Sequence, residues 1–189
     1  LVVPRNRYDE AVEAAAATMG GLKPGDPNDP GTICGPLISE RQRDRVQGYL
    51  DSASAEGGRF ACGGGRPASR DTGFFIEPTV IAGLDNTAKV AREEIFGPVM
   101  SVFPWSDEET MLDAVNGVEY GLTAAIITND LAKAMETAER VEAGYVWINS
   151  TGRYLGAPYG GWKQSGLGQE ECLDEVLSYT RIKNINMRW

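Results

Sequence analysis

Histidine is absent from the 189 residues of this chain. Within them, that excludes Ser-His and Cys-His nucleophile pairs and imidazole metal ligands, because both kinds of site need the ring nitrogens of histidine. Cysteine is scarce: Cys34, Cys62 and Cys172 are odd in number and far apart. They form neither a disulfide framework nor a CxxC metal knuckle. We therefore expect no metal site and a reducing, cytoplasmic location.

Positive charge and long apolar runs are also in short supply. The chain has 18 basic and 27 acidic residues, a formal charge of −9. Because no cluster of Lys and Arg stands out, neither nucleic acid nor an anionic membrane surface is an expected partner. No run approaches the roughly 18 apolar residues of a membrane span, and no signal-peptide pattern is found. With 42% hydrophobic and 24% charged residues, the composition is that of an ordinary globular domain.

The first half of the chain predicts two helices and a strand. The opening LVVPR is typical of a strand already under way, so we expect a boundary inside a longer protein. Apolar spacing predicts a helix over Tyr8–Met19. Ser39 and Gln42 have the spacing of a capping box, which predicts the start of a second helix. A strand is predicted around Phe74–Ile81.

Strands and helices then alternate from residue 99 to residue 149. Ser106 and Glu109 have capping-box spacing. LTAAIIT (Leu122–Thr128) is typical of a buried parallel strand. A helix with an inward stripe follows over Leu131–Val141, and AGYVWIN is a further buried strand. This βαβ pattern predicts an α/β fold, with a parallel open sheet flanked by helices.

The last segment, SYTRIKNINMRW (Ser178–Trp189), has a different character. Ile185, Met187 and Trp189 alternate along an otherwise polar, extended stretch. This pattern is too polar for a central parallel strand and suits an edge strand that pairs with another chain. A frayed terminus is the alternative. We favour an extended C-terminal strand docked on another subunit.

The stretch REEIFGPV places two acids and an aromatic ring beside a rigid Gly-Pro corner. In one interpretation, Glu93 and Glu94 are a solvated helix end and Phe96 is a core aromatic. In the other, one carboxylate binds the hydroxyls of a ribose while the ring packs on a flat heterocycle. On residue types alone, the first interpretation is favoured.

A glycine-rich loop, residues 148–171, follows the last predicted buried strand. Open α/β sheets bind ligands at the carboxyl ends of their strands, so Tyr154, Tyr159 and Trp162 can line an apolar substrate tunnel. The alternative is ordinary packing. The glycine spacing matches neither a P-loop nor GxGxxG. Glu170 and Glu171 are either an acid/base pair or the first turn of a helix, and the helix start is favoured.

Cys34, in TICGPLIS, is the cysteine that lies beside a Gly-Pro corner. A nucleophilic cysteine needs a nearby base or a lowered pKa, and no histidine is present to provide the base. We therefore interpret Cys34 as a small buried hydrophobic residue, and Cys62 and Cys172 as structural.

Taken together, these stretches resemble the aldehyde dehydrogenase superfamily. The resemblance runs through essentially the whole chain, and its motifs occur in this order: CGPLIS (Cys34–Ser39), GFFIEPTV (Gly73–Val80), EEIFGPV (Glu93–Val99), YGLTAAIIT (Tyr120–Thr128) and PYGGWKQSGLGQEE (Pro158–Glu171). It implies that residues 1–177 are part of a catalytic domain and that residues 178–189 are an oligomerisation strand. It also implies that the dinucleotide-binding domain, the nucleophilic cysteine and the general-base glutamate lie upstream of this chain.

The resemblance assigns expected roles to a few residues. Glu94 is expected to bind the nicotinamide ribose, Phe96 to pack near the nicotinamide, and Gln42 to make a weaker cofactor contact. Tyr154 and Tyr159 are expected to lie along the substrate tunnel, with Tyr159 standing where phenylalanine is commoner in the family. Glu170 matches a glutamate that belongs to a proton relay in the family.

The implied chemistry is the oxidation of an aldehyde to a carboxylic acid with NAD or NADP. The thiolate of the upstream cysteine attacks the aldehyde, hydride transfer leaves a thioester, and water hydrolyses it. A homo-oligomer, either a dimer or a tetramer, is expected through the C-terminal strand. Two alternatives remain: a non-catalytic oligomerisation or binding module, if the 189 residues exist alone, and a thiol enzyme that uses Cys34.

Overall fold

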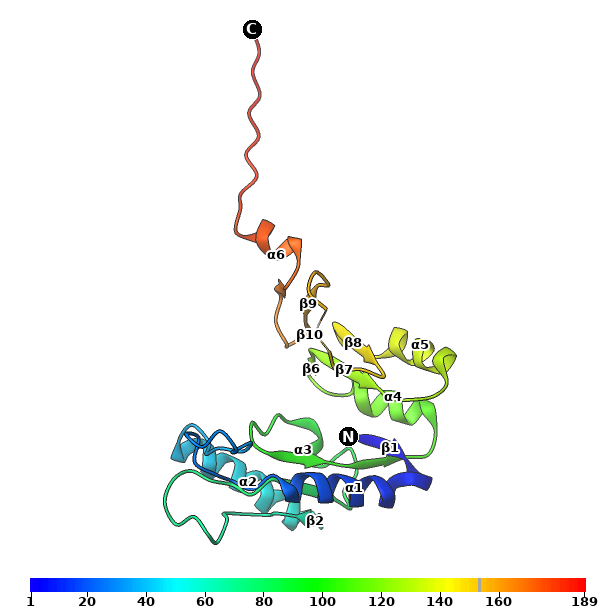
Figure 1. The fold of residues 1–189 in the computed structure, drawn as a ribbon. Helices are drawn as coiled ribbons and strands as arrows, with labels where there is room; N and C mark the ends of the chain where they lie inside the picture. The colour runs from blue at the N-terminus through cyan, green and yellow to red at the C-terminus, as the bar shows by residue number, and fades with distance from the viewer. Residues whose placement is uncertain (153) are drawn as a thin grey trace. The chain divides into compact units, whose positions relative to one another are not determined.

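The structure is a computed structural model, and it describes residues 1–152 and 154–189. The chain divides into two units, Leu1–Met111 and Leu112–Trp189 (Figure 1). The first unit contains β1 (Val2–Pro4), a 3-10 turn η1 (Arg5–Arg7), α1 (Tyr8–Gly21), α2 (Glu40–Ala55), β2 (Arg59–Cys62), β3 (Thr79–Ala82), α3 (Lys89–Arg92), β4 (Val99–Ser101) and β5 (Phe103–Trp105). Helix α4 (Glu108–Asn116) spans the boundary. The second unit continues with β6 (Tyr120–Gly121), β7 (Thr123–Ile126), α5 (Leu131–Arg140), β8 (Tyr145–Ile148), β9 (Tyr159–Gly160), β10 (Trp162–Lys163), β11 (Gln169–Glu170) and α6 (Leu173–Ser178).

The sheet of the first unit is built around β3. Strand β2 pairs with β3 antiparallel, and β4 pairs with β3 parallel. Val102 separates β4 from β5, and its N–H donates to the carbonyl of Ile81 at 2.9 Å. Strand β5 then pairs in parallel with β1, with Val2 opposite Phe103. The hydrogen-bonded ladder therefore passes from β3 along β4 and β5 to β1.

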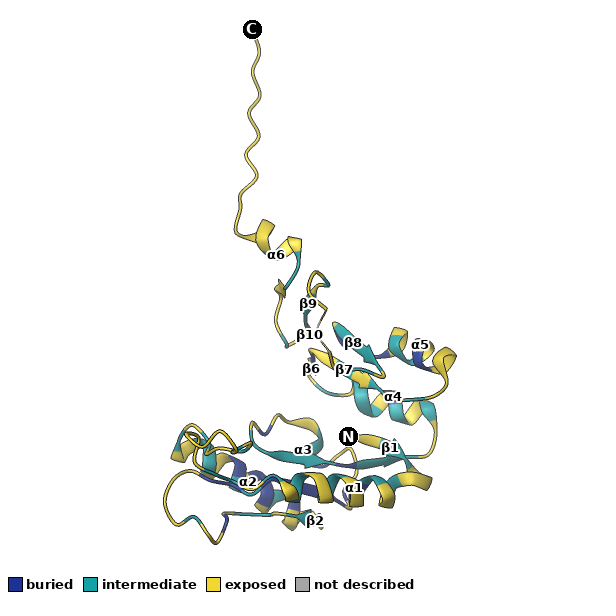
Figure 2. Cartoon of the chain, in the orientation of Figure 1, coloured by how far each residue is buried: buried dark blue, intermediate teal, exposed yellow. Residues whose placement is uncertain are grey.

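Helices α1 and α2 supply the two core clusters of this unit, and both clusters include β3. Val80 and Ala82 pack with Val12 of α1, whereas Ile81 packs with Val46 and Leu50 of α2. Because side chains alternate along a strand, the two clusters lie on opposite faces of β3. Figure 2 shows buried residues along α2 and the neighbouring strands. The helices predicted from Tyr8 and Ser39 are confirmed.

The strand predicted from Phe74 begins later, at Thr79. Pro78 lacks a backbone N–H and cannot donate to a ladder, so regular pairing starts after it. Phe75 and Ile76 are nevertheless buried, at 7% and 1% exposure. Phe75 and Ile76 therefore pack in the core from an irregular segment that leads into β3, and not from a strand.

The second unit contains the predicted βαβ arrangement. Strands β7 and β8 are parallel, from Thr123 opposite Tyr145 to Ile126 opposite Ile148, and α5 connects them. The prediction that both strands are buried is wrong for this chain, because both are half-buried at most and Thr123 is exposed. The core is thin: the buried apolar side chains in the described part of this unit are Leu112, Ala134, Val141 and Ala143.

The buried face of α5 and the N-terminal cap of α4 also differ from the predictions. Leu131 and Met135, two apolar residues of the helix predicted over Leu131–Val141, are 67% and 50% exposed, so the buried stripe of α5 is narrow. Helix α4 is capped by Asp107, whose Oδ1 accepts from the N–H of Thr110 at 2.9 Å. Ser106, the predicted cap, instead accepts a hydrogen bond from the Arg5 side chain at 2.9 Å. A carboxylate one residue further along thus replaces the expected hydroxyl.

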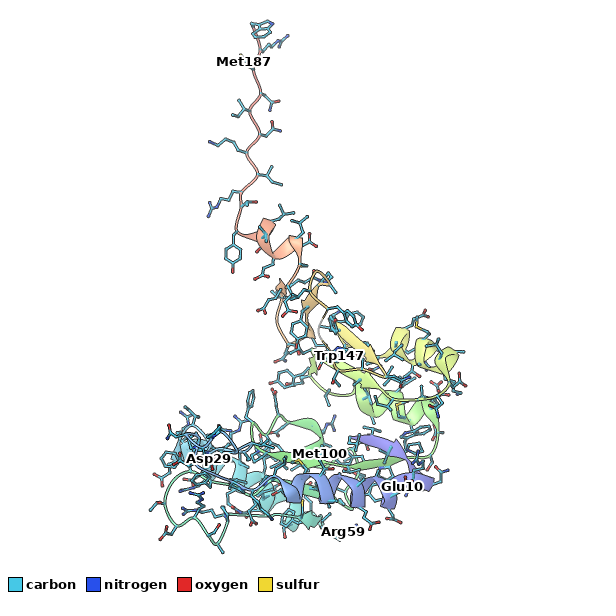
Figure 3. All side chains as sticks on the ribbon, viewed as in Figure 1. Glu10, Asp29, Arg59, Met100, Trp147 and Met187 are labelled. Carbon is cyan, nitrogen blue, oxygen red and sulfur yellow. The ribbon has the colours of Figure 1, made fainter. Side chains whose placement is uncertain are left out.

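Residues 181–189 follow α6 without a helix or strand, as an extended trace at the C-terminus (Figure 1). The large apolar side chains are exposed, including Ile185 and Met187 at 78% each, and Figure 3 labels Met187 near the end of this segment. Its pairing with another subunit remains a prediction.

Candidate functional site

The REEIFGPV corner connects α3 to β4, and one face of α2 holds it. Gln42, Arg45, Val46 and Tyr49 follow the spacing i, i+3, i+4, i+7, which places them on one side of a helix. Each of them contacts a residue between 93 and 97. The predicted site residues Gln42, Glu94 and Phe96 are therefore brought together in the first unit.

Gln42 fills only half of its predicted role in a capping box. Its N–H donates to the Ser39 hydroxyl at 3.2 Å, as expected. The side-chain amide, however, does not return to Ser39. It donates to the carbonyls of Ile95 at 3.3 Å and Phe96 at 2.9 Å. Gln42 therefore caps the helix through its backbone and holds the corner through its side chain.

Phe96 lies in a left-handed backbone conformation, with φ of 55°. This region is uncommon for a bulky residue, because its Cβ crowds the backbone. Phe96 is 63% exposed, and the centroid of its ring lies 5.9 Å from the Arg45 guanidinium carbon. An exposed ring on a constrained backbone is not a core aromatic, so the interpretation favoured from residue types alone is wrong for Phe96.

The two adjacent acids have different surroundings. Glu93 follows α3 directly, and its carboxylate accepts a hydrogen bond from the Tyr49 hydroxyl at 2.8 Å. Glu94 is exposed, and no described residue forms a hydrogen bond or ion pair with its carboxylate. Its backbone carbonyl accepts from Arg45 at 2.8 Å. Glu93 therefore has a protein partner, whereas Glu94 is available to a ligand.

Gly97 allows the corner to approach α2 closely. A Cβ at Gly97 would lie 2.7 Å from Cγ2 of Val46, which is fully buried. Contacts this short do not occur between real carbon atoms without displacement. After the glycine, the carbonyl of Pro98 accepts from the N–H of Thr79 at 2.8 Å, which joins the corner to the first rung of β3.

In the second unit, Tyr159 and Glu170 lie opposite each other on the antiparallel strands β9 and β11. The favoured prediction that Glu170 and Glu171 begin a helix is wrong. Glu171 has φ of 61°, and α6 starts only at Leu173, after Cys172. The structure therefore places Glu170 on an exposed strand, and its proposed role in a proton relay stays a prediction.

Aromatic rings line the start of the glycine-rich loop. The Tyr145 ring lies 4.9 Å from that of Trp147 and 5.4 Å from that of Tyr159. Trp147, labelled in Figure 3, donates its indole N–H to the carbonyl of Gly152 at 2.7 Å. Tyr154 is 66% exposed. Tyr159 therefore belongs to a packed aromatic row, while Tyr154 presents its ring to the surroundings.

Two further sets of contacts fix the glycine-rich loop: close packing of its backbone against Gly144, and the side chain of Lys163. Glycine is required at position 144, because a Cβ there would overlap the carbonyl of Gly160. Lys163 pairs with Glu142 at 2.6 Å and donates to the carbonyl of Asn116 at 2.5 Å. These contacts hold the loop against the rest of the second unit.

The surroundings of Cys34 do not favour its thiolate. Partial burial raises the pKa of Cys34, which favours the unreactive thiol over the thiolate. The three cysteines are free and only partly buried, so the description of Cys34 as a buried residue needs that correction. Among the described residues, no three His, Cys, Asp or Glu side chains lie close enough to hold a metal ion. In the same part of the chain, no helix combines the length and apolar character needed to cross a membrane.

Sequence reasoning missed the roles of Arg45 and Tyr49. The sequence motifs assign no role to either residue. A usable signal was present, because both fall on the same helical stripe as Gln42. Their partners lie more than 40 positions away, however, and no local pattern identifies them.

Comparisons with known proteins agree on one family. A model described as the aldehyde dehydrogenase family matches residues 1–185. Aldehyde dehydrogenase tropH of Talaromyces stipitatus is 47% identical over 173 residues, which are 88% of this chain and 34% of that protein. Betaine aldehyde dehydrogenase of Brucella melitensis is 42% identical over 188 residues, which are 98% of this chain and 39% of that protein.

Solved structures show the same likeness. An aldehyde dehydrogenase of Mycobacterium tuberculosis complexed with NAD+ has a TM-score of 0.90 at 43% identity, covering 95% of this chain and 37% of that one. The NAD+ complex of a Bacillus cereus aldehyde dehydrogenase has a TM-score of 0.90 at 34% identity, covering 96% and 37%. This likeness confirms the predicted α/β fold class. The chain spans only 34% to 39% of the length of these relatives.

Proposed function

This chain belongs to the aldehyde dehydrogenase family, and from that premise we propose that it forms part of an enzyme that oxidises an aldehyde to a carboxylic acid with NAD or NADP. The nucleophilic cysteine and the general-base glutamate of this proposal lie outside the 189 residues. The raised pKa of Cys34 supports that assignment, since a thiol of this kind is a poor nucleophile.

The observation that carries the proposal is the carboxylate of Glu94, which no described residue pairs, two residues before the exposed Phe96. A carboxylate accepts two hydrogen bonds from a ribose diol, and a flat ring packs against a nicotinamide. Both groups project from a corner held by α2. The carboxylate and the ring therefore fit a nicotinamide dinucleotide. Two of the solved relatives are NAD+ complexes.

When bound, the cofactor would accept a hydride from the substrate. Within this chain, Glu94 would fix the ribose next to the nicotinamide, and Phe96 would limit the movement of the ring. Gln42 would act through the corner, because its amide holds the carbonyls of Ile95 and Phe96. These roles concern orientation, which lowers the entropic part of the barrier to hydride transfer.

In the second unit, we assign Tyr154 and Tyr159 to the substrate tunnel and Glu170 to proton transfer. The exposed ring of Tyr154 and the aromatic row that includes Tyr159 support an apolar lining. The exposed strand position of Glu170 leaves its carboxylate accessible to water. Both assignments are independent of the cofactor site.

The proposal also covers domains, assembly and location. We assign residues 1–177 to part of a catalytic domain and residues 178–189 to an oligomerisation strand in a dimer or tetramer. The exposed apolar side chains of Ile182, Ile185, Met187 and Trp189 support the second assignment. A cytoplasmic location is proposed from three cysteines without a disulfide.

A direct test uses the full-length protein that contains this chain, with NAD+ and an aldehyde. Glu94→Gln should weaken NAD+ binding at least about tenfold, since an amide is a poorer acceptor for a diol than a carboxylate. Glu13→Gln on α1, also an exposed acid, is the matched control and should leave binding unchanged. Unaltered NAD+ affinity in Glu94→Gln would contradict the proposed site. The 189-residue chain alone should produce no NADH, and its activity would contradict the placement of the nucleophile.

A further inference from the structure

Two neighbouring carboxylates stand at the proposed cofactor site, and within residues 1–152 and 154–189 only that of Glu93 has a hydrogen-bond partner. We propose that Tyr49 and Arg45 are positioning residues that decide which carboxylate faces the cofactor, by binding Glu93 and leaving Glu94 exposed. The inference rests on the proposed function, because it concerns the same site. In this proposal, Tyr49 and Arg45 of α2 contact neither substrate nor cofactor and act only through Glu93 and Glu94.

Holding one acid leaves the site to the other. Glu93 lies in extended backbone directly after α3, with φ of −115° and ψ of 148°. Its carboxylate is held at the Tyr49 hydroxyl at 2.8 Å, whereas no described residue bonds the carboxylate of Glu94. The selection therefore follows from the one hydrogen bond that distinguishes these neighbouring acids.

The Tyr49 hydroxyl is itself held in place. The residue is only 6% exposed, and its ring lies 4.9 Å from the Lys89 ammonium and 5.5 Å from the Arg45 guanidinium. Nη2 of Arg45 donates to the hydroxyl at 3.2 Å, which leaves the hydroxyl proton directed at Glu93. The donors thus run in one direction, from Arg45 through Tyr49 to Glu93, and each bond polarises the next.

The same guanidinium nitrogen also fixes the backbone of the second acid. Nη2 of Arg45 donates to the carbonyl of Glu94 at 2.8 Å, and Gln42 holds the carbonyl of Phe96 at 2.9 Å. Together with Gly97 against Val46, these contacts over-determine the corner. A left-handed Phe96 persists only under such conditions, because the conformation is costly for a bulky residue.

The test measures NAD+ dissociation constants by calorimetry on the full-length protein that contains this chain. Tyr49→Phe keeps the buried ring but removes the hydroxyl, so Glu93 is released and competes with Glu94 for the site. NAD+ should bind about three- to tenfold more weakly, within the range of the net contribution of one hydrogen bond. The KM for aldehyde should not change.

A second variant separates positioning from a general loss of structure. In Tyr49→Phe/Glu93→Ala the competing carboxylate is gone, and NAD+ affinity should return to within about twofold of the wild type. If Tyr49 only supported the fold, removing a further side chain would bring no recovery. Failure of this rescue would therefore overturn the proposal.

Comparison with Glu94→Gln distinguishes failure of this inference from failure of the proposed function. Unchanged NAD+ affinity in Tyr49→Phe, with Glu94→Gln strongly weakened, overturns this inference and leaves the proposed function standing. If Glu94→Gln has no effect either, the proposed site fails. Should Tyr49→Phe not fold, Arg45→Met removes the donor to both Tyr49 and the Glu94 carbonyl from an exposed position. It should weaken NAD+ binding to a similar extent, and unchanged affinity would overturn the proposal.

Discussion

Asn149 and Thr128 hold each other through a reciprocal pair of hydrogen bonds at the ends of β8 and β7. The N–H of Thr128 donates to Oδ1 of Asn149 at 2.9 Å, and Nδ2 of Asn149 donates to the carbonyl of Thr128 at 2.8 Å. Asn149 has φ of 52°, a left-handed conformation that asparagine tolerates better than most residues. Its side-chain amide therefore takes the place of a backbone rung where the two strands diverge.

Asn149→Ala should destabilise the protein by about 2 kcal/mol, for two reasons. It removes both hydrogen bonds, and it puts alanine, which tolerates the left-handed region less well than asparagine, at this position. Asn149→Gly loses the same bonds but relieves the backbone, so it should cost about 1 kcal/mol less. Urea unfolding measures both values. Equal losses in the two variants would show that the left-handed backbone contributes nothing.

Gly97→Ala and Gly48→Ala should change stability in opposite directions. A Cβ at Gly97 meets Val46 at 2.7 Å, so the substitution should cost about 1–3 kcal/mol. Gly48 lies exposed within α2 with no atom within 4 Å of such a Cβ, and alanine should stabilise the helix by about 0.5–1 kcal/mol. Thermal unfolding of both variants checks the signs. Val46→Ala in the Gly97→Ala background should recover part of the loss.

Phe96→Gly should separate stability from cofactor binding. Glycine removes the left-handed strain, which should offset its greater freedom in the unfolded chain and leave stability unchanged or higher by up to about 1 kcal/mol. The loss of the exposed ring should still weaken NAD+ binding in the full-length protein. A variant with reduced stability and normal NAD+ affinity would contradict both parts of this prediction.

Asp107 should make the stability of α4 depend on pH. Hydrogen bonds from the hydroxyl and then the N–H of Thr110 lower the pKa of Asp107 in the folded protein. A lowered folded pKa means that this contribution is complete above the ordinary aspartate pKa of about 3.9 and is lost as pH falls through the folded pKa. Asp107→Asn cannot titrate, so its stability deficit at neutral pH should shrink in acid.

Unfolding measured between pH 3 and pH 7 tests the Asp107 prediction. Asp113→Asn controls for a change of charge on α4, because the Asp113 carboxylate is exposed and accepts no hydrogen bond from the described residues. A deficit in Asp107→Asn that stays constant across this range would contradict the assignment of the cap.

Removal of Ser178–Trp189 should weaken oligomerisation of the full-length protein. This segment contributes exposed apolar side chains and no buried ones, so the truncation should not disturb the cores of the two units. Ile185→Ser/Met187→Ser tests the same surface without shortening the chain. Light scattering gives the mass in solution. An unchanged mass in both variants would contradict the proposed strand.

Several features of the fold could be predicted because their causes are local. The period of apolar residues identified α1, α2 and the βαβ arrangement of β7, α5 and β8. The capping hydroxyl of Ser39 was predicted from spacing alone. The start of β3, the cap of α4 and the strand at Glu170 were not, because each depends on which neighbouring donor or acceptor the backbone finds.

The sequence by itself determined the family and the residue types at the proposed cofactor site, since the motifs are contiguous and ordered. The family resemblance assigned the ribose to Glu94, but residue type and spacing alone do not separate Glu93 from Glu94, which are chemically identical neighbours. The tertiary structure supplies the physical difference between them, because Tyr49 lies 44 positions from Glu93 and reaches it only once α2 packs against the corner. Likewise, the left-handed Phe96 is imposed by Gln42, Arg45 and Val46 from a distant helix. Hydrogen-bond partners remote in sequence are set by packing, which no local pattern encodes.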